Sequence, residues 1–158
     1  MNEVSINKNK KLSEHFTLGE LTKTSYHTLG GNIPSHVAIE NLTRLCLWLE
    51  LLRERYNRLY GDATREIPVI ITSGYRSEEV NRLCGGAKGS NHLTGCAVDI
   101  RCAGPEQMIR YACILLDTAD ENGWELDELI QEKRGTTYWV HFAVRPKENR
   151  RKILFDCR

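Results

Sequence analysis

The sequence predicts an α+β domain in which helices pack on one face of an antiparallel sheet and a polar cleft lies on the other face. Two segments, residues 35–61 and 105–123, repeat apolar residues every three or four positions, which is typical of amphipathic helices. Four short segments have the β-branched or alternating pattern of strands. They lie at residues 68–72, 97–100, 126–132 and 138–144.

Capping residues predict where the first helices begin and end. Thr17 and Glu20 are spaced as a capping box for a short helix that ends near Leu21. Ser35 is placed to cap the first long helix, and Gly61 is placed to end it.

Similar signals bound the later helices. Ser77 is expected to cap a brief helix that runs to Leu83. Pro105 suits the first turn of the second long helix, and Gly123 stops it. With 158 residues, 41% of them hydrophobic, the chain fits one folded unit. We predict a flexible N-terminal segment at residues 1–11 and a single folded domain at residues 12–158.

The candidate site lies in two of the predicted strands. His92 and Asp99 stand seven positions apart across a glycine turn, and alternation turns Asp99 away from the core-facing side of its strand. In the last strand His141 shares the polar side with Trp139, so His141 and Asp99 can face one cleft. Two histidines and one carboxylate form the open three-ligand set of a catalytic zinc ion.

Composition narrows the other classes of function. A net charge of +1 gives no electrostatic reason to expect nucleic acid as a partner. No apolar stretch approaches the roughly 20 residues that cross a membrane, and residues 1–11 lack the apolar core of a signal peptide. We therefore expect a monomer made in the cytoplasm, without membrane insertion, which reaches the cell wall only through lysis or a holin.

Two further expectations concern the cysteines and the C-terminal tail. The six cysteines show no CxxC pair, and we expect free, mostly buried thiols. The basic tail is interpreted as a solvated surface, with a contact to an anionic polymer as the lesser alternative. Its basic residues are Arg145, Lys147, Arg150, Arg151 and Lys152.

Three blocks, in this order, resemble the zinc D-Ala-D-Ala carboxypeptidase family, peptidase family M15. They are Ser73-Gly74-Tyr75-Arg76-Ser77, then Ser90-x-His92-x-x-Gly95-x-Ala97-x-Asp99, then Trp139-Val140-His141. The segment 16–21 also resembles the opening of small single-domain bacterial and phage members that cleave peptidoglycan peptides. The resemblance implies the fold that these enzymes share with the signalling domain of hedgehog proteins.

The resemblance also implies roles for individual residues. His92, Asp99 and His141 would bind one zinc ion, which is the set that spacing and alternation suggest independently. Arg76 would orient an anionic part of the substrate, such as a peptide carboxylate, because its guanidinium fork suits a carboxylate. Ser90 would hydrogen-bond the substrate or hold the ligand loop.

The catalytic base is less directly indicated. Several relatives carry a glutamate three residues before the last histidine, where this chain has Tyr138. Glu132 resembles the glutamate that many small relatives carry in a hydrophobic-Ile-x-Glu context, so we predict it as the base, with Glu128 second and Asp127 third. Since Glu128, Ile130 and Glu132 share one nominal strand face, a twist or strand end is expected to expose Glu132 without exposing Ile130.

These observations predict a zinc-dependent peptidase that cleaves the peptidoglycan stem peptide with metal-activated water, as a D,D-carboxypeptidase or as an endopeptidase of the endolysin type. Two alternatives remain open. One is a catalytically silent, zinc-stabilised binding module of the same fold, which Tyr138 supports. The other is a zinc hydrolase of small dipeptides, since the same metal chemistry would cleave them.

Overall fold

The structure is a computed structural model that describes residues 5–158. Its first five elements are α1 (Leu18–Leu21), α2 (His36–Tyr60), β1 (Ile71–Ser73), α3 (Glu78–Leu83) and the 3₁₀ helix η1 (Asn91–Thr94). Its second half contains β2 (Ala97–Cys102), α4 (Pro105–Asn122), β3 (Glu128–Arg134), β4 (Thr137–Ala143) and β5 (Lys152–Cys157). The protein is therefore α+β, as predicted.

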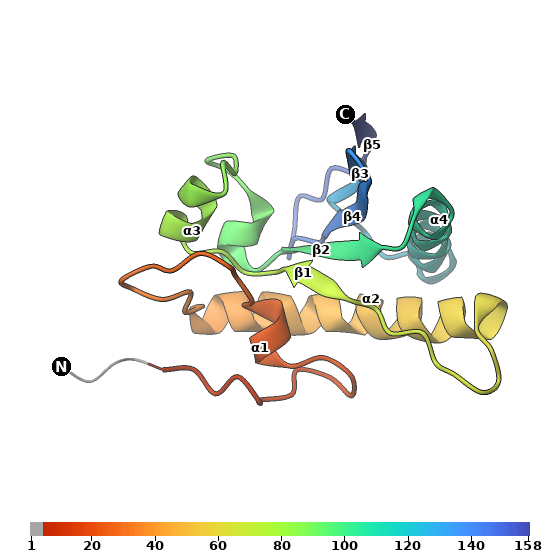
Figure 1. Ribbon diagram of the computed structural model, residues 1–158, viewed down its shortest axis with the longest axis horizontal. Helices are drawn as coiled ribbons and strands as arrows, with labels where there is room; N and C mark the ends of the chain where they lie inside the picture. Colours follow the sequence, from red (N-terminus) through yellow and green to blue (C-terminus); the bar gives the residue numbers. More distant parts are fainter. Residues whose placement is uncertain (1–4) are drawn as a thin grey trace.

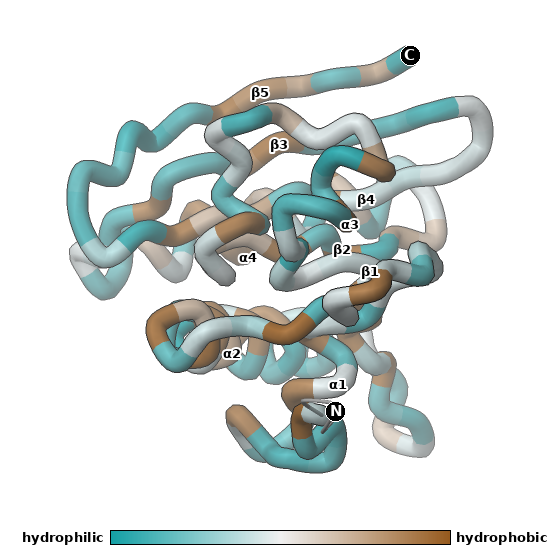
Figure 2. The backbone as a smooth tube through the Cα atoms, turned by 90° about the vertical axis from the view of Figure 1, so that its left-hand side faces the viewer, coloured by the Kyte–Doolittle hydropathy of each residue, from teal (hydrophilic) through white to brown (hydrophobic). Residues whose placement is uncertain are grey.

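The five strands form one mixed sheet in the order β1-β2-β4-β3-β5, which Figure 2 shows from β1 up to β5. The pairs β1/β2, β2/β4 and β3/β4 are antiparallel, but β5 runs parallel to β3. The prediction of an antiparallel sheet is therefore wrong for the last strand. The chain crosses back after β4 before β5 begins, so β5 runs in the direction of β3.

The strand β5 was not predicted, and its position explains why. It is an edge strand, and its residues are mostly exposed, so no apolar alternation marks it. Backbone hydrogen bonds hold it in place instead: Lys152 N donates to Asp127 O at 2.8 Å, and Arg158 N donates to Lys133 O at 2.8 Å.

The caps that the sequence predicts are present. The side chain of Thr17 accepts a hydrogen bond from Glu20 N, and the side chain of Glu20 accepts one from Thr17 N, which completes the capping box. Ser35 and Ser77 cap α2 and α3 through their side chains. Gly123 ends α4 in the left-handed conformation.

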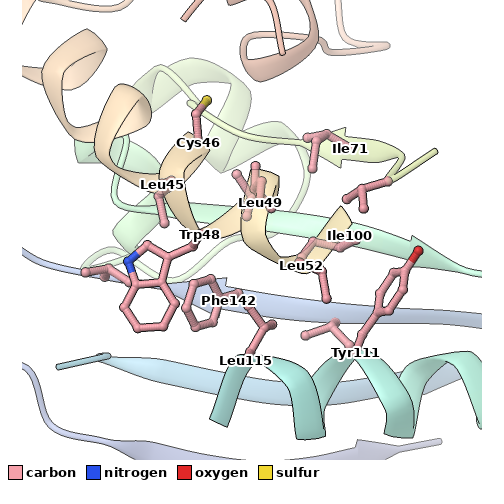
Figure 3. Packing of buried hydrophobic residues seen from close by; sticks show 14 of the residues in the cluster. Leu45, Cys46, Trp48, Leu49, Leu52, Ile71, Ile100, Tyr111, Leu115 and Phe142 are labelled. Atoms are coloured by element: carbon pink, nitrogen blue, oxygen red, sulfur yellow. The ribbon is translucent and has the colours of Figure 1, made fainter. Parts of the chain in front are cut away.

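The two long helices, α2 and α4, cover the same face of the sheet, whereas α3 lies on the other side of β1 and β2 (Figure 1). Trp48 of α2 meets Phe142 of β4 edge-on, with ring centroids 5.1 Å apart. Figure 3 shows Trp48 beside Phe142, and Tyr56 of α2 and Tyr111 of α4 make a similar contact at 4.9 Å. Aromatic burial of this kind holds helices and sheet together and leaves the opposite sheet face for polar residues.

The first described residues pack against α1. Leu18 N donates to Lys10 O at 2.8 Å, and Gly19 N donates to Lys8 O at 2.9 Å. Of the predicted flexible segment 1–11, residues 1–4 lie outside the described part of the chain, and its flexibility remains a prediction. Among residues 5–158, no helix combines the length and apolar character needed to span a membrane.

The six cysteines are free, as predicted. Cys46, Cys96 and Cys102 are buried, whereas Cys113 and Cys157 are exposed and Cys84 is intermediate. Three of the six are buried, so the expectation that most of them are buried is not confirmed.

Candidate active site

Strand register brings Asp99 and His141 together. The two residues are direct partners across the antiparallel pair β2/β4. Their neighbours Val98 and Phe142 point to the helices and are fully buried. Alternation therefore sends Asp99 and His141 to the opposite face, as predicted from the sequence.

His92 reaches the same place from η1. Ser90 caps this 3₁₀ helix by accepting from His92 N, and Gly95 ends it with φ of 73°. A Cβ atom at Gly95 would lie 2.4 Å from the carbonyl oxygen of Ala38 in α2. Glycine thus allows both the left-handed turn and the close approach that direct the chain from His92 into β2.

The three side chains form a compact cluster. His92 Nε2 lies 3.3 Å from Asp99 Oδ1, and His141 Nδ1 lies 3.0 Å from the same oxygen. One ligand atom from each residue lies within 4.8 Å of the other two. The side chains are almost buried, with exposed fractions of 2% for His92, 12% for Asp99 and 11% for His141.

The free nitrogen of His92 indicates that the cluster fits a metal ion. His92 Nδ1 lies 2.6 Å from the carbonyl oxygen of Gly74, to which it can only donate. The other nitrogen, Nε2, is buried and has no hydrogen-bond partner among the described residues. A histidine bonded through one nitrogen to a backbone carbonyl, with the other nitrogen facing a carboxylate, has the arrangement of a zinc ligand.

Gly74 is itself fixed by α1. Tyr75 N donates to Leu21 O at 2.7 Å, so the chain after β1 runs directly along the end of α1. A Cβ atom at Gly74 would lie 2.2 Å from that same oxygen. The carbonyl that orients His92 is therefore held by packing that no larger residue would permit.

Charges in the cluster favour a cation. Burial alone would raise the pKa of Asp99, but His92 and His141 hold it well below its usual range. Burial would lower the pKa of His141, but hydrogen bonds to Asp99 and Glu128 raise it to about 9. The carboxylates thus favour positive charge at the cluster, which a bound metal ion would supply.

Arg76 and Ser90 both line the cleft around this cluster. Arg76 Nη2 donates to Asp99 Oδ2 at 2.8 Å, and its Nε donates to Ser73 Oγ at 2.9 Å. Ser90 Oγ accepts from His92 N at 3.3 Å, which matches the loop-holding role that the sequence left open for it. Their roles toward a substrate remain predictions.

Glu132 lies on the cleft face of β3. Trp139 Nε1 donates to Glu132 Oε2, and the other oxygen has no hydrogen-bond partner among residues 5–158. Burial raises the pKa of Glu132, and the negative charge of Asp99 raises it further. A carboxylate with a raised pKa is suited to accept a proton near neutral pH.

Glu128 is placed differently, although it is on the same strand. Its Oε2 lies 2.9 Å from His141 Nε2 and accepts from Asn91 Nδ2, while its Oε1 accepts from Arg150 Nη2. The hydrogen bond to His141 is the main cause that lowers the pKa of Glu128 to about 2. Its neighbour Asp127 has a fully buried carboxylate, which is bonded to Arg150 and Asn91.

Ile130 corrects one expectation about this strand. Its cross-strand partner is His141, so Glu128, Ile130 and Glu132 all face the cleft. Ile130 is half-buried and lines the cleft together with the two glutamates. No twist is needed to expose Glu132 because the core-facing residues of β3 are Leu129 and Gln131 instead.

The cluster lies in a cleft of about 590 Å³, a volume within the usual range of ligand sites. Residues 84–87, 89 and 90 of the loop line one part of it, and residues of β3 with Trp139 line another. Arg134 and Lys152 also line it, so the cleft carries positive charge beyond Arg76. Asp99, Glu128 and Glu132 line the same cleft, so it carries charges of both signs.

The sequence did not predict the contributions of Asn91, Arg145 and Arg150. Arg150 and Arg145 were assigned to a solvated basic surface, but both form ion pairs with the buried carboxylate of Asp127. Both side chains are still partly exposed, at 30% for Arg145 and 46% for Arg150, so the interpretation as a surface holds but misses their ion pairs. A lone aspartate beside an apolar strand, followed downstream by several arginines, is the only local signal for this pairing.

Comparisons with known proteins agree with the geometry. The family model described as Peptidase M15 matches residues 14–131, which include His92, Asp99, Arg76 and Ser90. A search of curated proteins found no match. The match covers more than half of the chain and implies a peptidase with a peptide substrate. This chain, with its buried His-Asp-His cluster at the floor of a cleft, belongs to the Peptidase M15 family.

Proposed function

We propose that the protein is a zinc-dependent peptidase that hydrolyses a peptide bond in the stem peptide of peptidoglycan. The observation that carries this proposal is the convergence of His92, Asp99 and His141 with a buried, unpaired histidine nitrogen at the cleft floor. The three motifs that resemble zinc D-Ala-D-Ala carboxypeptidases support the cell-wall substrate. Carboxypeptidase and endopeptidase activity both fit the cleft.

In this proposal His92 Nε2, Asp99 Oδ1 and His141 Nδ1 hold the zinc ion. Zinc at this position supplies a Lewis acid that acidifies water and polarises a carbonyl group. Glu132 accepts a proton from the attacking water and delivers it to the leaving amine. Trp139 orients Glu132 by holding one carboxylate oxygen, so that the other oxygen is available for proton transfer.

Hydrogen bonding distinguishes Glu132 from the other two candidates for the base. Both carboxylate oxygens of Glu128 already accept hydrogen bonds, from groups that include His141 and Arg150. Asp127 is fully buried beneath Arg150 and does not line the cleft. Of the three candidates, Glu132 alone combines cleft exposure with a carboxylate oxygen that is free to take a proton.

We propose that Arg76 binds an anionic group of the substrate. Its guanidinium lines the cleft, and its Nη1 has no hydrogen-bond partner among the described residues. The contact with Asp99 fixes the plane of the guanidinium. A fixed guanidinium presents its remaining N–H groups to a carboxylate in a defined orientation.

Tyr138 gives little support to the alternative of a catalytically silent module. It packs against the hydrophobic core, and strand alternation places it on the face opposite Trp139. A glutamate at this position would therefore point away from the cleft. The lack of a glutamate at position 138 does not remove a base from this site.

The test uses purified protein loaded with zinc and incubated with defined muropeptides and with small D,D-dipeptides. We expect cleavage of the stem peptide, loss of cleavage after chelation, and recovery when zinc is restored. Mass spectrometry of the products identifies the bond. Glu132→Gln is the matched control, because it should bind zinc without cleaving.

The other outcomes separate the alternatives. Tight zinc binding with no cleavage of any muropeptide would identify a binding module. Cleavage of dipeptides alone would identify a small-dipeptide hydrolase. Failure of the protein to bind zinc would refute the proposal as a whole.

A further inference from the structure

We propose that Glu128 is a positioning residue that fixes the orientation of His141 in the metal cluster, and that Asn91 and Arg150 hold Glu128 for this task. The proposal rests on the proposed function in one respect, since it assumes that the cluster binds zinc. It assigns to Glu128 a role different from that of a catalytic base.

The two nitrogens of His141 face two different carboxylates. Nδ1 lies 3.0 Å from Asp99 Oδ1, and Nε2 lies 2.9 Å from Glu128 Oε2. A neutral imidazole carries one N–H and one lone pair. If Nε2 donates to Glu128, the lone pair is on Nδ1, where it faces His92 and Asp99. Glu128 thus selects the tautomer and holds the ring plane at the same time.

The carboxylate of Glu128 is itself held by two other donors. Asn91 Nδ2 donates to Oε2 at 2.9 Å, and Arg150 Nη2 donates to Oε1 at 2.9 Å. With donors on both oxygens, the carboxylate is fixed in position and orientation. Its side chain is only 14% exposed, so little water competes for these bonds.

Each of the two supporting residues is fixed in turn. Asn91 directly precedes the ligand His92, and its Nδ2 also donates to Asp127 Oδ2 at 2.7 Å. Arg150 donates to both oxygens of Asp127, at 3.0 Å from Nε and 2.7 Å from Nη2. The network therefore links the segment that carries His92 to the imidazole ring of His141 through Glu128.

The network explains why two acidic residues occur together at the start of β3. Asp127 is the buried anchor for Arg150, and Glu128 uses the same arginine while facing the cleft. The chain between β4 and β5 thereby supports the metal cluster, although it lies beyond the region that the family model matches. Activity should therefore depend on residues far from the three sequence motifs.

The test measures zinc affinity by competition with a chromophoric chelator at a fixed pH. Glu128→Met keeps the length of the side chain but removes its acceptor oxygens, and we expect zinc to bind roughly 10- to 100-fold more weakly. Glu128→Gln keeps an oxygen that can accept from His141 Nε2 but turns an NH2 group toward the donor Arg150 Nη2, so we expect its zinc affinity to fall less than that of Glu128→Met. Rescue by Gln but not by Met is the signature of positioning.

A second readout is the absorption spectrum of the Co²⁺-substituted proteins. Wild type and Glu128→Gln should give the same spectrum, whereas Glu128→Met should give a changed one because His141 can rotate. Glu132→Gln is the matched control on the same strand and should bind zinc as wild type does. Thermal unfolding of the metal-free proteins shows whether each variant folds, and Glu128→Ala replaces Glu128→Met if the latter does not.

The outcomes are distinguishable from those for the proposed function. If Glu128→Met and Glu128→Ala bind zinc as tightly as wild type, the positioning role is refuted while the peptidase proposal stands. Equal loss in Glu128→Gln and Glu128→Met also refutes it, because an accepting oxygen would then not matter. A wild-type protein that binds zinc but cleaves nothing refutes the proposed function alone, and one that binds no zinc refutes both.

Discussion

Replacing Gly95 by alanine should destabilise the protein through two separable effects. The residue has φ of 73°, a region that costs an alanine roughly 1 to 2 kcal/mol. The new Cβ would also lie 2.4 Å from Ala38 O and 3.1 Å from Ala38 Cα, which are backbone atoms of α2. Forcing η1 and α2 apart should add about 1 to 3 kcal/mol, the usual range for overpacking.

The matched control is Gly123→Ala. Gly123 has φ of 64° at the end of α4, but a Cβ there would meet nothing within 4 Å. It should therefore show the conformational effect alone. For a domain of this size each kcal/mol lowers Tm by roughly 2 to 4 °C, so Gly123→Ala should lose a few degrees and Gly95→Ala about twice as much.

Thermal unfolding of the metal-free variants, followed by circular dichroism, measures both changes. Zinc affinity should fall in Gly95→Ala as well, since η1 carries His92. Equal losses of Tm in the two variants would refute the argument from close approach. Unchanged zinc affinity in a destabilised Gly95→Ala would show that η1 does not need this contact to place its ligand.

Three further predictions concern the site and its support. Glu132→Gln should lower kcat by roughly 10²- to 10⁴-fold with zinc still bound. Retained activity in steady-state kinetics would reject Glu132 as the base. Arg76→Ala should mainly raise KM for stem peptides, and unchanged kinetics would remove it from the substrate site. The pKa of Asp127 is lowered from 3.8 to about 2 against the effect of burial, chiefly by Arg150, so its ionised form contributes about 2 kcal/mol of stability above pH 4. That contribution should fade as the pH falls from about 4 to 2. Denaturant unfolding across this range should show that the free energy of unfolding of Asp127→Asn depends less on pH than that of wild type.

Local patterns predicted the helices and the approach of His92, Asp99 and His141 to one another well. Capping residues and apolar spacing act within a few positions, so the ends of α2 and α4 could be placed from the sequence. Alternation likewise predicted that Asp99 and His141 face one cleft. The direct pairing of these two residues depends on strand register, which alternation alone does not fix.

Features that depend on distant contacts were missed. β5 is held by backbone bonds to β3, and its apolar residues Ile153, Leu154 and Phe155 are consecutive and exposed, without the alternation of a half-buried strand. Arg150 resembles any exposed arginine in the sequence because its partner Asp127 is 23 positions away. Similarly, nothing near Asn91 indicates that its amide links two acidic residues of β3.

The contact between Gly74 and α1 limits how the protein can be shortened or fused. His92 is oriented by the carbonyl of Gly74, and Gly74 lies directly against the last residue of α1. A deletion that removes α1 would remove the support of His92, the proposed zinc ligand, while sparing every residue that lines the cleft. Fusion partners and truncations at the N-terminal end should therefore leave α1 intact, and loss of zinc from a chain trimmed past Leu21 would follow from lost support for His92.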